Sequence, residues 1–96
     1  MTVENKKRPL LSIMSHIHVN ELDIQRGKQN SSSQCFVAQS LRRQGFIDIE
    51  VDYYDTNVVR VEADCYIYRE VNPELARLLA DFDGGEIVQP CSIRLD

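Results

Sequence analysis

Three side chains in this sequence could carry covalent or acid–base chemistry: Cys35 and two histidines, His16 and His18. Cys35 follows a run of serines, residues 31–33, where a helix is expected to begin, and the positive end of a helix dipole stabilises a thiolate. The histidines are two residues apart, so a strand would present both imidazoles on one face. One alternative for the function is therefore a small thiol-dependent enzyme that uses Cys35 with His16 or His18.

The same residues also have a structural interpretation. A free cysteine is among the most buried residue types, and a zinc site built on the two histidines would need further ligands that the local spacing does not supply. The three cysteines, Cys35, Cys65 and Cys91, are odd in number and include no C-x-x-C pair, which is typical neither of a disulfide framework nor of a zinc ribbon. We therefore predict no catalytic residue, no metal and no cofactor.

An acidic strand gives a different candidate site. Asp48, Glu50 and Asp52 occupy alternate positions and therefore share one face of a strand, while apolar residues occupy the other face. The simplest interpretation is the solvated face of a sheet. The functional interpretation is a docking surface for a basic protein, such as one that holds nucleic acid, with Tyr54 as an aromatic anchor. We predict Asp48, Glu50, Asp52 and Tyr54 as partner-binding residues.

Charge is divided unevenly along the chain. Residues 1–9 contain three basic residues and one acidic residue, which leaves eight basic and fourteen acidic residues and a net charge of −6 in residues 10–96. A body of this charge repels nucleic acid unless its basic residues cluster, so nucleic acid is not the expected partner. The alternative is a nucleic-acid-binding accessory protein that contacts phosphate through Arg26, Lys28, Arg42 and Arg43.

The elements that must position these residues follow from periodicity and from capping residues. Alternation predicts strands over residues 11–19, 46–53, 58–62, 66–68 and 87–95, the last interrupted at Pro90. A short helical turn is expected over residues 20–24, and main helices over 33–44 and 73–83. Asn72-Pro73 is typical of an N-cap and first helical residue, and Gly45 and Gly84 are placed to end the two main helices. The middle three strands form a meander.

These elements predict an α+β fold, with an antiparallel-rich sheet of four or five strands and two main helices on one face, in the order β-α-β-β-β-α-β. Near the end of the second main helix, Asp81 and Asp83 lie at the negative end of the helix dipole, so both need compensation. We expect an arginine from elsewhere in the chain, or instead a basic residue of a partner, beside Asp81, and a turn in which Asp83 accepts from the following N–H groups. The predicted core is Ile13, Ile17, Val37, Leu41, Ile49, Val51, Val61, Leu75, Leu79, Phe82 and Ile93.

The length of 96 residues suits a single domain over residues 10–96, preceded by a flexible basic tail over residues 1–9. No apolar run approaches the roughly 20 residues that cross a bilayer, and polar residues interrupt any signal-peptide core, so we expect a cytoplasmic protein with no membrane partner. A chain of this size buries roughly 60–65% of its unfolded surface. Further burial would come from a protein partner or from a second copy in a homodimer.

Several short motifs occur in a fixed order along the chain. They are Ile17-x-Val19, Asp23-Ile24-x-x-Gly27, Cys35-Phe36-Val37-Ala38, Phe82-Asp83-x-Gly85 and Val88-x-Pro90. This arrangement resembles a family of small uncharacterised proteins of actinobacteria and their phages, over about residues 16–96. The chain departs from the family pattern at Asp23, Phe36 and Cys91, where the family has histidine, proline and phenylalanine. The resemblance implies a phage or mobile-element setting and no particular activity.

Taken together, these features favour a non-enzymatic protein-interaction module that acts through its acidic surface. The resemblance adds the phage or mobile-element setting, in which an inhibitor of a host defence system would fit. The enzyme built on Cys35 and the accessory protein built on the basic cluster are the two alternatives.

Overall fold

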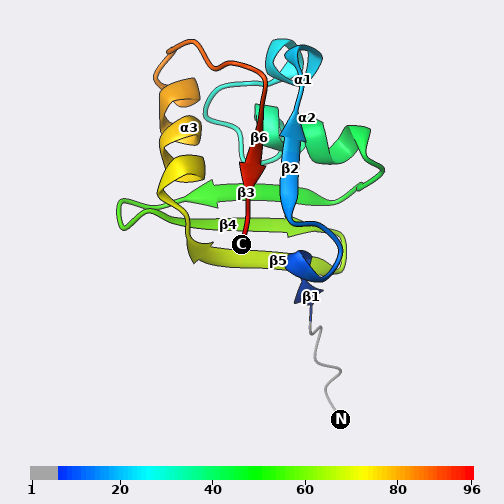
Figure 1. Cartoon of the computed structure of the whole chain (residues 1–96). Coiled ribbons are helices and arrows are strands. Elements are labelled where there is room, and N and C mark those ends of the chain that lie inside the picture. Colours follow the sequence, from blue (N-terminus) through cyan, green and yellow to red (C-terminus); the bar gives the residue numbers. More distant parts are fainter. Residues whose placement is uncertain (1–6) are drawn as a thin grey trace.

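The computed structural model describes residues 7–96 of the chain, which form an α+β fold with a mixed four-stranded sheet, a separate two-stranded sheet and three α-helices. In chain order the elements are β1 (Arg8–Pro9), the 3-10 helix η1 (Leu10–Ser12), β2 (His16–Val19), α1 (Glu21–Arg26), α2 (Phe36–Arg43), β3 (Ile49–Tyr53), β4 (Val58–Ala63), β5 (Tyr66–Val71), α3 (Pro73–Asp83) and β6 (Cys91–Arg94). The helices lie on one side of the four-stranded sheet (Figure 1). The predicted fold class and the approximate order of the elements are confirmed.

The four-stranded sheet has the strand order β1-β5-β4-β3, so β3 lies at one edge. β3, β4 and β5 form the predicted antiparallel meander, in which Val51 pairs with Val61 and Asp52 pairs with Arg60. Side chains alternate between the two faces of a strand, and this explains the packing. Val51 and Val61 are buried on the helix side, while Asp52 and Arg60 are only partly covered on the opposite face.

The first described residues extend this sheet. Arg8 and Pro9 pair with β5 in the parallel direction, and the N–H of Arg8 donates to the carbonyl oxygen of Cys65 at 2.8 Å. We predicted a flexible tail over residues 1–9, whereas its last two residues are part of the sheet. Residues 1–6 of that tail lie outside the described residues, whereas Lys7 is described.

β2 and β6 form their own antiparallel sheet rather than joining the meander, and they lie on the helix side of the larger sheet (Figure 1). Ile17 pairs with Ile93, and both side chains are fully buried, while His16 and His18 alternate with them on the other face. The predicted single sheet of four or five strands is therefore divided into two.

The segment before β2 differs from the prediction. We expected one strand over residues 11–19, but the N–H groups of Ile13 and Met14 both donate to the carbonyl oxygen of Leu10, which closes a 3-10 turn. This turn buries Leu10 and leaves Ile13 47% exposed. The assignment of Ile13 to the core was therefore wrong, and Leu10 takes its place. The ten other predicted core residues are all buried.

Both main helices begin close to the predicted positions. α2 starts at Phe36 with Cys35 as its N-cap residue, three residues later than expected, because Ser31 forms a turn with Gln34 and Cys35 before the helix. α3 starts at Pro73, and the Asn72 side chain accepts from the N–H of Leu75, as the Asn72-Pro73 pair predicts. None of the helices within residues 7–96 is long and apolar enough to cross a membrane.

Candidate functional site

The acidic surface consists of Asp48, Glu50, Asp52 and Tyr54, and the structure places all four residues along the edge strand β3 and its immediate ends. Glu50 and Asp52 alternate with buried residues and lie on the face opposite the helices. Asp48 precedes the strand and is exposed, and Tyr54 follows the strand and is 48% exposed. The predicted residues are therefore neighbours on one edge of the sheet.

Basic side chains neutralise part of this surface. Arg60 forms ion pairs with Asp52, at 3.8 Å, and with Glu62 on its own strand, β4. Lys7 also pairs with Glu62, at 3.0 Å. Among residues 7–96, neither Asp48 nor Glu50 forms an ion pair, so the negative charge is concentrated at these two positions.

The loop before α2 contacts the backbone edge of β3 through a hydrogen bond. The N–H of Val51 donates to the carbonyl oxygen of Ser32 at 2.8 Å. Ser32 lines a pocket on each side of this bond: one of about 370 Å³ with Asp52 and Asp83, and one of about 460 Å³ with Asp48 and Glu50. Carboxylates therefore line the β3 edge on both sides of the bridge.

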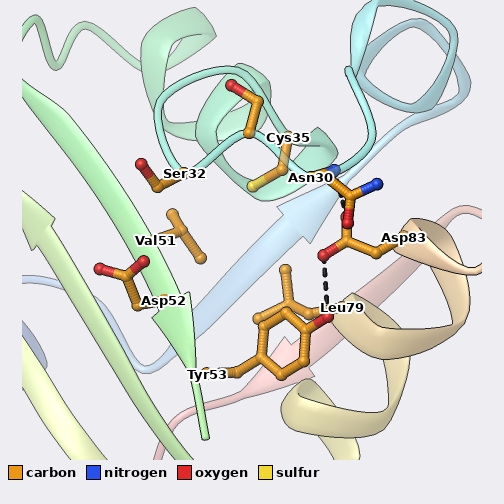
Figure 2. Close-up of a pocket in the computed structure, with 9 residues that line it drawn as sticks. Asn30, Ser32, Cys35, Val51, Asp52, Tyr53, Leu79 and Asp83 are labelled. Atoms are coloured by element: carbon orange, nitrogen blue, oxygen red, sulfur yellow. Dashed lines mark hydrogen bonds between the residues drawn. The ribbon is translucent and has the colours of Figure 1, made fainter.

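The smaller pocket is organised around Asp83, the last residue of α3 (Figure 2). One of its carboxylate oxygens accepts from the hydroxyl of Tyr53 at 2.8 Å, and the other accepts from the N–H of Asn30 at 2.7 Å. We expected the compensation of Asp83 to come from the N–H groups that follow it, and this was wrong. The partners come instead from β3 and from the loop before α2, 30 and 53 residues away in sequence.

The arginine expected beside Asp81 is likewise missing from the ion pairs formed within residues 7–96. The position of Asp83 at the negative end of the α3 dipole indicated that its carboxylate needs hydrogen-bond donors. It did not indicate that Tyr53 and Asn30 would provide them.

Burial and the neighbouring carboxylate of Asp83 raise the pKa of Tyr53 from 10.0 to about 12. Because the pKa of the folded state is higher than that of the unfolded state, the neutral phenol stabilises the fold below pH 10, and this contribution is lost as the pH rises through about 12. The hydroxyl therefore donates to Asp83 throughout the neutral range.

Replacement of Tyr53 by phenylalanine is expected to lower the free energy of unfolding by about 1.5 kcal/mol, since it removes a hydrogen bond to a charged acceptor. Urea denaturation at neutral pH measures this difference. The matched control is Tyr54→Phe, which removes the hydroxyl of an exposed tyrosine and should change stability little, because that hydroxyl forms no hydrogen bond within residues 7–96. Equal effects of the two substitutions would show that the Tyr53–Asp83 bond contributes nothing.

Cys35 and the histidines are not arranged for nucleophilic catalysis. Cys35 is 3% exposed, and burial raises the pKa of its thiol, which favours the protonated form over the reactive thiolate. The Nδ1 atom of His18 is 2.6 Å from the Ser92 hydroxyl oxygen, and that of His16 is 2.8 Å from the Ser15 hydroxyl oxygen. No hydrogen bond joins Cys35 to either imidazole in the described part of the chain.

The two imidazole rings stack with 6.1 Å between their centroids on the outer face of the β2–β6 sheet, whereas Cys35 belongs to the core. Within residues 7–96, no group of three or more histidine, cysteine, aspartate or glutamate side chains is arranged to hold a metal ion. The geometry therefore gives no support to a site built from His16, His18 and a cysteine.

The fold and the site define a small α+β domain that presents carboxylates along an open sheet edge. Neither a family model, a curated protein nor a solved structure matches the chain. The resemblance to the family of actinobacteria and their phages stays a prediction based on the residue motifs.

Proposed function

We propose that this protein is a non-enzymatic interaction module that binds a basic protein partner through the acidic surface. The observation that carries the proposal is the pair of pockets on the two sides of the Ser32–Val51 bond. Five carboxylates line them, and the one basic residue in either lining, Lys7, is paired with Glu62. Complementary charge of this kind accelerates association and selects the partner.

The remaining composition of this face also suits protein recognition. Tyr54 follows β3, and the register places Val58 of β4 directly opposite Val71 of β5 at the same end of the sheet. Val71 is 65% exposed. Protein interfaces commonly combine such aromatic and apolar anchors with a surrounding polar rim. This face of the sheet therefore offers apolar side chains that could anchor a partner, next to the negative charges of the acidic surface.

The negative charge along the β3 edge has a second consequence. An edge strand exposes backbone groups that invite pairing with another strand, and charged side chains discourage pairing with an identical copy. The carboxylates along β3 would attract a basic segment of another protein, whereas they would repel the carboxylates of a second copy of this chain. This argument favours a different, basic protein as the partner over a homodimer formed at β3.

The biological setting is proposed from the residue motifs and not from the geometry. A phage or mobile-element protein that inhibits a host defence system would act by occupying a surface of a host protein, and a target that holds nucleic acid would offer a basic surface. An acidic surface on a small domain is suited to that role.

The test uses a triple variant in which Asp48→Asn, Glu50→Gln and Asp52→Asn remove the charge of the acidic surface while keeping side-chain size. Tagged wild-type protein and the variant are passed through a lysate of the native host, and the retained proteins are identified by mass spectrometry. We expect a basic partner whose retention falls at least about tenfold in the variant, which corresponds to about 1.4 kcal/mol. Retention by the wild type should also weaken as salt is added.

The matched control removes the same number of charges elsewhere, from exposed carboxylates of α1, α3 and the loop after α3. It carries Glu21→Gln, Glu74→Gln and Glu86→Gln. Circular dichroism confirms that both variants are folded. A partner retained equally by the wild type and the acidic-surface variant, or lost equally from both triple variants, would contradict the proposal.

A further inference from the structure

A third charged pocket, of about 240 Å³, lies where α1 packs against α2, and its charge is opposite to that of the acidic surface. It is lined by Asp23, Arg26, Gln39, Arg42 and Arg43. It shares no lining residue with the two acidic pockets. Three of the four basic residues that the sequence suggested as a phosphate contact are therefore brought together, and Lys28 is not among the lining residues.

The only carboxylate in this pocket is already neutralised. Asp23 is 2% exposed and accepts two hydrogen bonds from Arg43, from Nε at 3.1 Å and from Nη2 at 2.9 Å. Asp23 also accepts from the N–H of Asn20 at 2.9 Å. Arg43 and Asp23 therefore form a closed pair, and neither contributes net charge to the pocket.

Two arginines remain without a counter-charge. Neither Arg26 nor Arg42 forms an ion pair within residues 7–96, and Arg42 is held in place because its Nη2 donates to the carbonyl oxygen of Ser33 at 2.8 Å. Both residues lie in the last turns of their helices, where a positive charge suits the helix dipole. The dipole alone does not require the two guanidinium groups to line the same pocket, where they repel each other.

We infer that this pocket binds a doubly charged phosphate, either free or as a small phosphomonoester. A dianion would balance the charges of Arg26 and Arg42, and the planar guanidinium group presents paired N–H donors that match phosphate oxygens. The side-chain amide of Gln39 adds a polar group to the wall. The volume is below the roughly 300–1,000 Å³ of pockets that enclose drug-sized ligands, so it suits a single phosphoryl group.

The test follows the side-chain Nε–H signals of the arginines by NMR while inorganic phosphate is added at constant ionic strength. We expect saturable shifts of the Arg26 and Arg42 signals with a Kd of about 1 mM. Arg26→Gln and Arg42→Gln should each raise this Kd about tenfold. The matched control is Arg69→Gln, which removes an exposed arginine from β5 and should leave the Kd unchanged.

A parallel titration with phosphoserine separates the two sources of the phosphate. Tighter binding of phosphoserine supports a phosphomonoester as the natural ligand, and tighter binding of inorganic phosphate supports the free ion. Shifts that do not saturate, that chloride reproduces, or that keep the same Kd in Arg42→Gln would overturn the inference. Binding of a short oligonucleotide without terminal phosphate, in the absence of phosphate binding, would also overturn it, because each phosphodiester carries a single charge.

Discussion

Replacement of Arg43 by glutamine is expected to lower the free energy of unfolding by about 3 kcal/mol. Arg43 is the partner that neutralises Asp23, whose side chain is almost completely buried between α1 and α2. A buried carboxylate that loses its charged partner keeps its desolvation cost without the compensating attraction. Because Arg43 itself is 41% exposed, we place the loss at the lower end of the range for buried pairs.

A double-mutant cycle with Asp23→Asn distinguishes this mechanism from a general loss of packing. The asparagine removes the buried charge and can still accept from the N–H of Asn20. The double variant Asp23→Asn/Arg43→Gln should therefore be more stable than Arg43→Gln alone. Chemical denaturation measures all four proteins, with Arg77→Gln on α3 as a control for the loss of an exposed arginine. A loss below about 1 kcal/mol for Arg43→Gln would show that the pair contributes little.

The Asp23–Arg43 pair also shows where sequence patterns stop being informative. The Asn20 cap and the short helix after it follow from local residue types, because Asn20 and Asp23 satisfy each other's backbone N–H groups three residues apart. The choice of Arg43 as the partner of Asp23 depends on how α1 and α2 pack. No local pattern distinguishes Arg43 from Arg42, although one closes an ion pair and the other lines a pocket without a carboxylate partner.

The same division applies to the fold. The meander was predicted because apolar and charged residues alternate through β3 and through residues 59–62 of β4, and α3 was predicted because Asn72-Pro73 caps it. The separate pairing of β2 with β6 joins residues about 75 positions apart, as in the pair of His18 with Ser92, and periodicity carries no information about such pairing. β1 was missed because two residues are too few to show a period.

For the candidate site, the sequence predicts the direction of side chains but not the pockets between elements. Alternation alone places Glu50 and Asp52 on one face of β3. The pocket beside Asp52 exists because the end of α3 brings Asp83 to Tyr53, and because Ser32 reaches the edge of β3. These contacts depend on the loop between α1 and α2, whose path is set by one residue at its start.

That residue is Gly27, and its replacement by alanine is expected to lower the free energy of unfolding by about 3 kcal/mol. A Cβ atom at this position would lie 2.7 Å from the backbone nitrogen of Phe36 and 2.9 Å from the ring of Phe82. Phe36 is fully buried, and its ring centroid is 4.9 Å from that of Phe82, so neither neighbour can move without opening the core. Gly27 has an ordinary φ of −65°, which makes close packing the reason for glycine here.

We expect Gly27→Ala to displace the loop between α1 and α2 and thereby to disturb the pocket that Asp52 and Asp83 line. The N–H of Lys28 donates to the carbonyl oxygen of Gln34 at 2.7 Å, which closes the loop that holds Asn30 and Ser32 beside Asp83 and Val51. Gly45→Ala is the matched control, because nothing lies within 4 Å of the added Cβ and its φ of +110° should cost only roughly 1–2 kcal/mol. We expect Gly27→Ala to cost more than this control in urea denaturation and to shift the NMR signals of Tyr53 and Asp83, which Gly45→Ala should leave in place. If Gly27→Ala costs less than the control and leaves those signals unmoved, the loop does not depend on the close approach of Gly27 to Phe36.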